Sequence, residues 1–341
     1  MIDTLVRAQP LPDEWVRGYA GRVARLNGWS SKSGMTDALL NVKGRRRNSW
    51  LEVTLVQLMA SIAAMDLSLF LRDHSLFGLW RSAARFEPSC FLGQEKKSGF
   101  LKLLGMRPAR ADGYLCPMCV QEDIGFHGQS YWRREHQLPG RAVCPRHKAP
   151  LRCVDLEKVG QLSPAACIQT RCSWECEQYV EVEKEVHVER FLDVCSHLMN
   201  AGLATDGREV SRIARLHAHA HGFHTGSYAH RLPYISDRIA ETFDATFLDE
   251  VFPGLRQNHR GTSWSPIDDA FLGSPTSSTL VYVVVFSYLI QNADQAALAI
   301  IKCKPSGNIT PPVRKVGRMV EDAQRNQAYL EGGGSHQLVA L

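Results

Sequence analysis

The sequence predicts a mainly helical protein with small β elements near its centre. Apolar residues recur at helical spacing in both halves of the chain, and the middle carries paired cysteines on proline-containing turns. With 341 residues, 44% of them hydrophobic, the chain can bury the cores of two or three domains. We expect a helical N-terminal part over residues 1–112, a ribbon region over 113–190, and a helical C-terminal domain over 191–341 that ends in a flexible tail.

The N-terminal part contains a long apolar stretch over residues 51–71. Its apolar side chains fall at the spacing of one helix face: Leu55, Leu58, Met59, Ile62, Met65 and Leu69. The simplest interpretation is a buried core face. A docking face for a partner helix is the alternative.

A concentrated basic turn precedes this stretch. It consists of Lys43, Arg45, Arg46 and Arg47, with Gly44 between the first two. Such a cluster suits contact with phosphates or with an acidic partner. Solvated surface explains it equally well.

The strongest chemical signal is a pair of short motifs, Cys116-Pro-Met-Cys119 and Cys144-Pro-Arg-His147. Each motif places two ligands on a tight turn, and the four together form the ligand set of a tetrahedral zinc site. Four protein ligands leave no open position, so the ion would stabilise the fold of a zinc ribbon and would not catalyse a reaction. Buried cysteines without a metal are the alternative.

A zinc deaminase is excluded by the order of its motifs. That chemistry needs an H-x-E motif upstream of P-C-x-x-C. Here the nearby His187-Val-Glu189 lies downstream, and no proline precedes Cys116.

Further cysteines follow the first site. Cys153, Cys167, Cys172 and Cys176 predict a second zinc site, although His187, Cys195 or His197 could each replace one of them, and some could be ordinary thiols. His136 lies between the two motifs of the first site. We expect it to be packed or hydrogen-bonded and not a ligand, because four better-spaced residues already complete that site.

The C-terminal region returns to helical patterns. Residues 210–216 and 232–248 have the lengths expected of a helix-turn-helix-like unit, and Phe252-Pro-Gly254 would terminate its last helix. A generic helical bundle gives the same pattern. A second helical pair is expected across residues 280–301. His217 and His221 stand one helical turn apart, but nothing nearby completes a metal site with them.

Charge and cysteine content indicate the cellular context. A net charge of +5 is only mildly basic, so contacts with nucleic acid should be patchy or shared with a partner. Cysteines at metal spacing without a secretory signal favour a reducing cytoplasm, and the longest apolar run, residues 280–290, is too short for a membrane span. We expect a cytoplasmic protein with no membrane contact.

The sequence contains no recognisable catalytic motif. It has no G-x-x-x-x-G-K-[ST] phosphate-binding loop, no G-x-S-x-G elbow and no carboxylate pair in a nuclease context. We therefore expect a protein that is not an enzyme.

Several stretches resemble the TniQ/TnsD family. They are the two metal motifs, the connecting Tyr131-Trp-Arg-Arg-Glu-His-Gln-Leu-Pro-Gly140, and the N-terminal Leu11-Pro-Asp-Glu-Trp15 and Gly21-Arg-Val-Ala-Arg-Leu-Asn-Gly28. The resemblance covers roughly residues 10–153. After Pro12 the chain reads Asp-Glu-Trp where the family commonly has Glu-Ser, and the C-terminal half resembles family members only loosely.

The resemblance implies a target-selection adaptor for DNA transposition. Such a protein links a target, either DNA or a CRISPR guide-RNA effector complex, to an AAA+ ATPase and through it to a DDE transposase; it could also form a homodimer. The alternative is a stand-alone, zinc-containing, sequence-specific DNA-binding regulator whose C-terminal helices read a major groove. The salt dependence of the affinity for naked DNA distinguishes the two hypotheses. A stand-alone binder loses affinity steeply as salt rises but keeps its specific site, whereas an adaptor binds naked DNA weakly.

Overall fold

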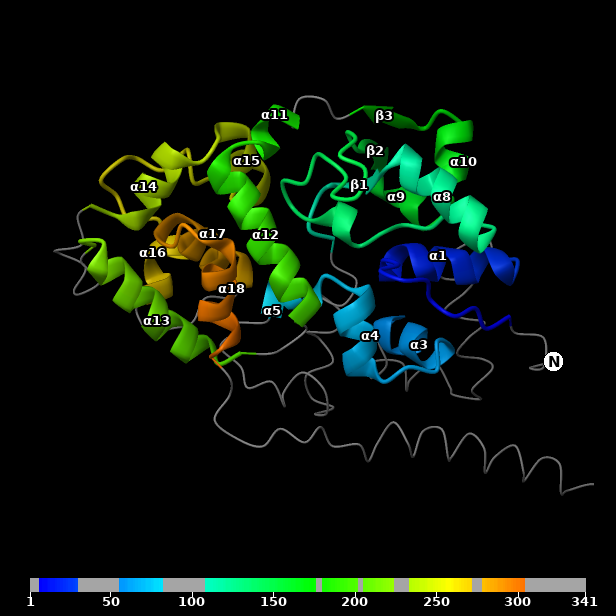
Figure 1. Cartoon of the computed structure of the whole chain (residues 1–341), viewed down its shortest axis with the longest axis horizontal. Helices are drawn as coiled ribbons and strands as arrows, with labels where there is room; N and C mark the ends of the chain where they lie inside the picture. The colour runs from blue at the N-terminus through cyan, green and yellow to red at the C-terminus, as the bar shows by residue number, and fades with distance from the viewer. Residues whose placement is uncertain are drawn as a thin grey trace, which may run out of the picture.

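The computed structural model describes residues 6–29, 55–81, 108–175, 180–201, 205–223, 233–271 and 278–303. Three groups of elements follow one another along the chain: N-terminal helices, a central region with a small sheet, and C-terminal helices (Figure 1). The predicted fold class, mainly helical with small β elements, is confirmed. The basic residues Lys43, Arg45, Arg46 and Arg47 lie outside the described residues, as do Cys176 and the tail from residue 304.

The N-terminal helices are α1 (Val16–Leu26), α3 (Leu55–Ile62), α4 (Leu67–His74) and α5 (Phe77–Arg81). The apolar stretch 51–71 was expected to follow one helix face, but the chain breaks between α3 and α4. Ala64 takes a left-handed conformation with φ 51°, and Asp66 caps α4 by accepting from the backbone N–H groups of Ser68 and Leu69. The break turns Leu69 outward, 45% exposed, and buries Phe70 in its place.

The central region is built on a three-stranded antiparallel sheet with the order β1-β2-β3. Its strands are β1 (Asp112–Leu115), β2 (Arg152–Asp155) and β3 (Ser173–Glu175), and Tyr114 pairs with Cys153 across the first two. Short helices surround the sheet: α8 (Pro117–His127), η3 (Glu135–Gln137), α9 (Leu156–Val159) and α10 (Pro164–Gln169). The long segment between β1 and β2 therefore carries both metal motifs.

The C-terminal group is entirely helical in its described residues. Its elements are α11 (Val180–Glu183), α12 (Val186–Ala201), α13 (Gly207–Ala220), α14 (Ile235–Thr242), α15 (Ala245–Val251), α16 (Ser265–Asp268), η6 (Asp269–Phe271), α17 (Thr279–Leu289) and α18 (Ala293–Ile301). Nearly every residue of α17 is buried, because this apolar helix is packed by α12, α13 and α18. The pair α17 and α18 matches the helical pair expected across residues 280–301.

The stretch expected over residues 232–248 forms two short helices. Its apolar residues Ile235, Ile239, Phe243, Phe247 and Leu248 are all buried, as the helical spacing predicts. Asp244 begins the second helix, since its carboxylate accepts from the backbone N–H groups of Thr246 and Phe247. A DNA-reading role for the helix-turn-helix-like unit of residues 210–216 and 232–248 stays a prediction.

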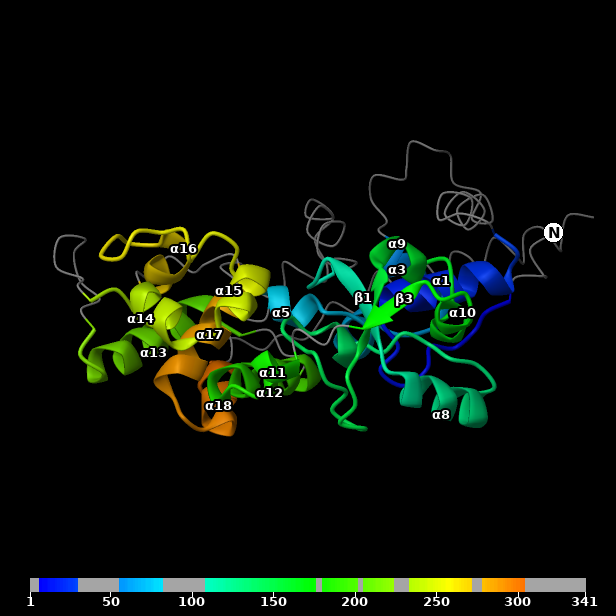
Figure 2. The ribbon, with the colours of Figure 1, turned by 90° about the horizontal axis from the view of Figure 1, so that it is seen from above.

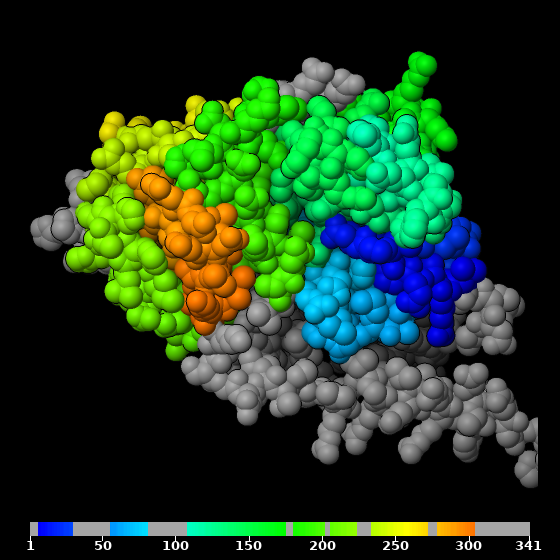
Figure 3. All heavy atoms as spheres, viewed as in Figure 1, coloured from blue at the N-terminus to red at the C-terminus, as the bar shows by residue number. Residues whose placement is uncertain are grey.

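Helix α12 joins the N-terminal and C-terminal helices into one buried core. It packs on α17 and α18 on one side and on α4 and α5 on the other. One continuous cluster of buried side chains consequently runs from Trp15 in the N-terminal part to Cys303 after α18. Figures 2 and 3 show the C-terminal helices at one end of the molecule and the N-terminal helices together with the central region at the other.

Within the described segments, no single helix combines the length and apolar character needed to cross a membrane. Helices α3 and α4 meet those criteria only when they are taken together, and the chain bends by 101° between them.

Replacing Gly21 with alanine tests how closely α1 approaches the central region. A Cβ at this position would lie 2.5 Å from the carbonyl oxygen of Gly160, a backbone atom that cannot move aside independently. We expect Gly21→Ala to lower the free energy of unfolding by about 1–3 kcal/mol in denaturant titrations. Gly125→Ala is the control, because nothing lies within 4 Å of the added methyl group in α8. A gain of about 0.5–1 kcal/mol is expected there, and similar effects of the two substitutions would contradict the packing.

Candidate metal centre

Two turns bring the four sequence-predicted ligands together. Cys116 directly follows β1 and is the N-cap residue of α8, with Pro117 in the first helical position, and Cys119 lies in the first turn of that helix. Cys144 and His147 lie on the second turn. The ligand atoms of all four residues are within 4.8 Å of one another, and the three cysteines are buried.

The second turn is shaped by its own backbone. The N–H of Cys144 donates to the carbonyl of Ala149 and the N–H of Lys148 donates to the carbonyl of Cys144, each at 2.8 Å. Lys148 takes φ 53° to close the turn, and a β-bridge joins Val143 to Pro150. This closed turn fixes where the side chains of Cys144 and His147 point.

Four of the six distances between ligand atoms are close to the edges of one tetrahedron. The Nδ1 of His147 lies 3.6 Å from the sulfur of Cys116, 3.3 Å from that of Cys119 and 3.6 Å from that of Cys144. The sulfurs of Cys119 and Cys144 are 3.7 Å apart. A tetrahedral ion with metal–sulfur bonds of about 2.3 Å and a metal–nitrogen bond of about 2.05 Å requires edges of about 3.8 Å and 3.6 Å. The four residues can therefore bind a metal ion.

The close approach of the thiols changes their acidity. Hydrogen bonds from the thiols of Cys119 and Cys144 lower the pKa of Cys116, which favours its thiolate. Binding a metal requires all three cysteines to be thiolates, so the affinity of the site must fall as pH falls.

A carboxylate outside the ligand set orients His147. The Nε2–H of His147 donates to Oε1 of Glu122 at 2.7 Å, and the other carboxylate oxygen of Glu122 accepts from Arg146 at 3.0 Å. This hydrogen bond holds the imidazole in the tautomer whose free Nδ1 faces the three sulfurs. Sequence analysis missed Glu122, although its position one helical turn beyond Cys119 indicates a carboxylate close to the ligands.

His136 lies beside the ligand set and not within it. Its ring is buried, and Nε2 is 3.5 Å from the sulfur of Cys144 and 3.9 Å from that of Cys119. From this side an N–H group can donate to both sulfurs, which stabilises thiolates. The structure therefore places His136 as a hydrogen-bonded neighbour of the site, the role expected from the sequence.

The cysteines of the predicted second site are placed differently. Cys153 packs in the same buried cluster as the first site. Cys167 lies in the main core instead, with the thiol of Cys172 3.5 Å from its carbonyl oxygen. Among the alternatives, Cys195 is buried within α12, His187 packs on the Phe243 ring and His197 contacts Asp294.

In the part of the chain that the structure describes, the first site is the one His/Cys/Asp/Glu group gathered at metal-binding distance. Cys176 falls outside that part. A second zinc site stays a prediction.

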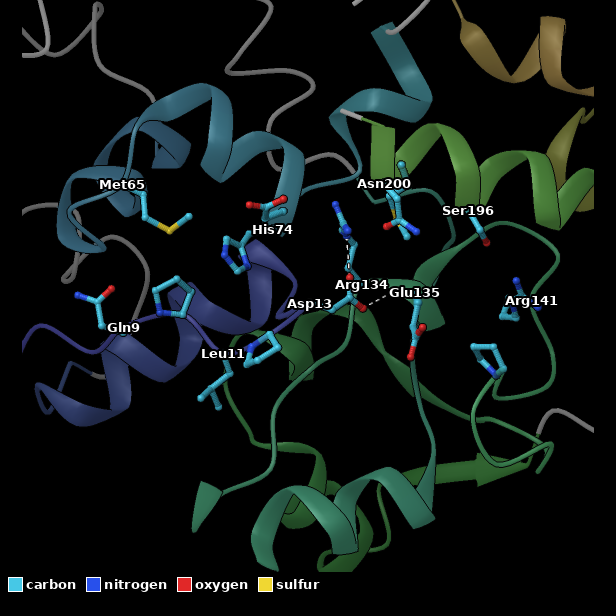
Figure 4. Close-up of a pocket in the computed structure, with 15 residues that line it drawn as sticks. Gln9, Leu11, Asp13, Met65, His74, Arg134, Glu135, Arg141, Ser196 and Asn200 are labelled. Carbon is cyan, nitrogen blue, oxygen red and sulfur yellow. Dashed lines mark hydrogen bonds and ion pairs between the residues drawn. The ribbon is translucent and has the colours of Figure 1, made fainter. Parts of the chain in front are cut away.

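A pocket of about 710 Å³ lies where the N-terminal helices, the metal region and α12 meet (Figure 4). Asp13 and His74 line one side of it, Glu135 and Arg141 come from the metal region, and Ser196 comes from α12. Asp13 anchors the metal region to the N-terminal part, because its carboxylate accepts from Nε of Arg134 at 2.9 Å and from the backbone N–H of Glu135 at 3.0 Å.

The carboxylate of Glu135 has a different environment. One of its oxygens is buried without a hydrogen-bond donor among the described residues. Burial raises the pKa of Glu135 above its usual range, and the negative charge of Asp13 adds to the rise. The folded protein therefore holds this proton more tightly than the unfolded chain does.

Replacing Glu135 with glutamine tests this environment. Because the folded-state pKa is raised, stability falls as pH rises from the unfolded pKa through the folded pKa. We expect Glu135→Gln to raise the midpoint of thermal unfolding at pH 7, with a gain that shrinks as pH is lowered toward about 4. Glu157→Gln, at an exposed position in α9, is the matched control. A lower midpoint for Glu135→Gln at pH 7 would show that the carboxylate has a stabilising partner.

Comparison with known families identifies the domain that carries this site. Residues 5–151 match the TniQ family model, and this segment contains all four metal-site residues. No curated protein matches the chain. TniQ proteins are non-catalytic adaptors that work within transposition complexes, so the domain implies a role associated with target selection in transposition. Residues 5–151 of this chain therefore form a TniQ domain.

Proposed function

We propose that this protein is a non-catalytic adaptor that selects target sites for DNA transposition. It would recognise a target and present a surface that recruits an AAA+ ATPase, which in turn engages the transposase. The match of residues 5–151 to TniQ carries this proposal, since it covers the N-terminal helices and the metal centre together.

We propose further that the ion at Cys116, Cys119, Cys144 and His147 is Zn²⁺. Three thiolates and one imidazole at tetrahedral spacing form a donor set that zinc prefers. When bound, the ion would cross-link the two turns and stabilise the fold, because four protein ligands complete its coordination. The protein's own part is to aim the ligands, which the turn at Cys144 and the hydrogen bond from His147 to Glu122 accomplish.

The charge of the chain supports a shared mode of target binding. A net charge of +5 over 341 residues is small for a protein that must hold DNA alone. Modest contacts with a target complex and with an ATPase give strong binding only when all the partners assemble, which would make integration conditional on a correct target. The target is DNA or a CRISPR guide-RNA effector complex.

Affinity purification of the tagged protein from the cell that encodes it, with and without nuclease treatment, tests the proposal. We expect an ATPase with a phosphate-binding loop to co-elute together with the target. A guide RNA and its effector identify a ribonucleoprotein target, whereas a discrete DNA fragment that nuclease removes identifies direct binding to DNA. One DNA site without any ATPase supports the stand-alone regulator, and recovery of neither partner nor nucleic acid contradicts the adaptor.

A salt titration with purified protein and naked DNA provides the second readout. The adaptor is expected to bind weakly and with little sequence preference. A specific site that survives competitor DNA, with affinity that falls steeply as salt rises, would favour the regulator.

A further inference from the structure

The segment that leads into Cys144 is held by a carboxylate from beyond the TniQ-matching residues. Glu183, in α11, accepts from the backbone N–H of Ala142 at 2.5 Å and from that of Val143 at 2.6 Å through Oε2, and from Nη1 of Arg141 at 2.7 Å through Oε1. The side chains of Glu183 and Arg141 are only 11% and 10% exposed. One buried carboxylate therefore fixes three consecutive residues that end directly before a metal ligand.

A second carboxylate holds the start of the same segment. Glu250, in α15, accepts from the backbone N–H of Gly140 at 3.2 Å and from Nε and Nη2 of Arg110 at 2.5 and 3.2 Å. Arg110 also donates through Nη1 to the carbonyl of Arg141, so the guanidinium bridges the carboxylate and the segment. Gly140 takes φ 80° and lies against the ring of Phe247 in α15, where an added Cβ would be 2.8 Å from two ring carbons.

The two carboxylates are the acceptors for three backbone N–H groups of this segment. Ala142 is fully buried, so its N–H depends on Glu183 and not on water while α11 is docked. Hydrogen bonds to a charged acceptor are stronger than neutral ones, and here three donors converge on Glu183 and three on Glu250. The position of Cys144 thus depends on helices of the C-terminal group.

We propose that Glu183 and Glu250 are positioning residues through which the C-terminal helices hold the Cys144–His147 half of the metal centre. The docking of α11 and α15 and the binding of the metal are then coupled: each strengthens the other by the same factor. A partner that displaces α11 or α15 would loosen the metal, and loss of the metal would loosen these helices. This inference rests on the metal binding proposed above.

The test compares zinc release from four variants. Glu183→Gln and Glu250→Gln keep the size of each side chain, but an amide NH₂ would face the donors that the carboxylate now accepts. The controls are exposed acidic neighbours on the same helices, Glu181→Gln, which loses a surface pair with Lys184, and Asp249→Asn, which loses one with Arg256. Released zinc is followed with the indicator 4-(2-pyridylazo)resorcinol, and circular dichroism checks that each variant is folded.

We expect zinc release from Glu183→Gln and Glu250→Gln to be faster by about tenfold or more, which is the usual cost of losing an outer-shell partner, with both controls unchanged. Unchanged release from two folded variants would overturn the coupling while leaving the metal site itself intact. A wild-type protein that holds no zinc would contradict the metal assignment together with the coupling.

Hydrogen exchange on the wild-type protein gives an answer even if a variant fails to fold. Removing the metal with a chelator should raise amide exchange in α15 (Ala245–Val251) and α11, in addition to the ligand turns. Exchange that rises only within residues 116–147 would overturn the proposal.

Discussion

The convergence of two distant turns on one point is the constraint on which the central region depends. Cys116 and Cys119 lie at the start of α8, Cys144 and His147 lie on a turn far along the chain, and the sheet is too small to hold them together alone. A short three-stranded sheet buries little apolar surface, so a metal cross-link between the turns would contribute what a larger core otherwise supplies. The four donor atoms lie within 4.8 Å of one another, a spacing that suits such a cross-link.

Contacts at increasing distance from the four ligands connect them to the rest of the molecule. Glu122 and His136 contact the ligands themselves, Glu183 and Glu250 hold the segment before Cys144, and α12 packs the C-terminal helices against the N-terminal ones. The matched TniQ domain is therefore not packed as an isolated unit in this chain, because elements outside residues 5–151 complete its buried hydrogen bonds. In the adaptor proposed above, a contact at the C-terminal helices would be transmitted to the metal region.

Sequence reasoning succeeded where the signal is local. The two short-spaced metal motifs meet in one cluster that could bind a metal ion, and helical periodicity found the buried residues of α14 and α15. It missed the break between α3 and α4. A single alanine and a single aspartate within an apolar stretch do not indicate a left-handed residue or a helix N-cap there. It could not find Glu183 or Glu250, since each acts on residues 40 or more positions away and many exposed glutamates look the same in sequence. Nor could it show that the sheet places Cys153 beside the first site, because that depends on the pairing of β1 with β2.

X-ray absorption spectroscopy at the zinc edge of the purified protein tests the central claim most directly. The account predicts about one zinc per TniQ domain with three sulfur neighbours at about 2.3 Å and one nitrogen at about 2.0–2.1 Å. The spectrum should not change when a substrate-sized ligand such as imidazole is added, because no coordination position is open. Fewer than three sulfurs, an oxygen neighbour from water, or a protein that holds no metal would contradict it.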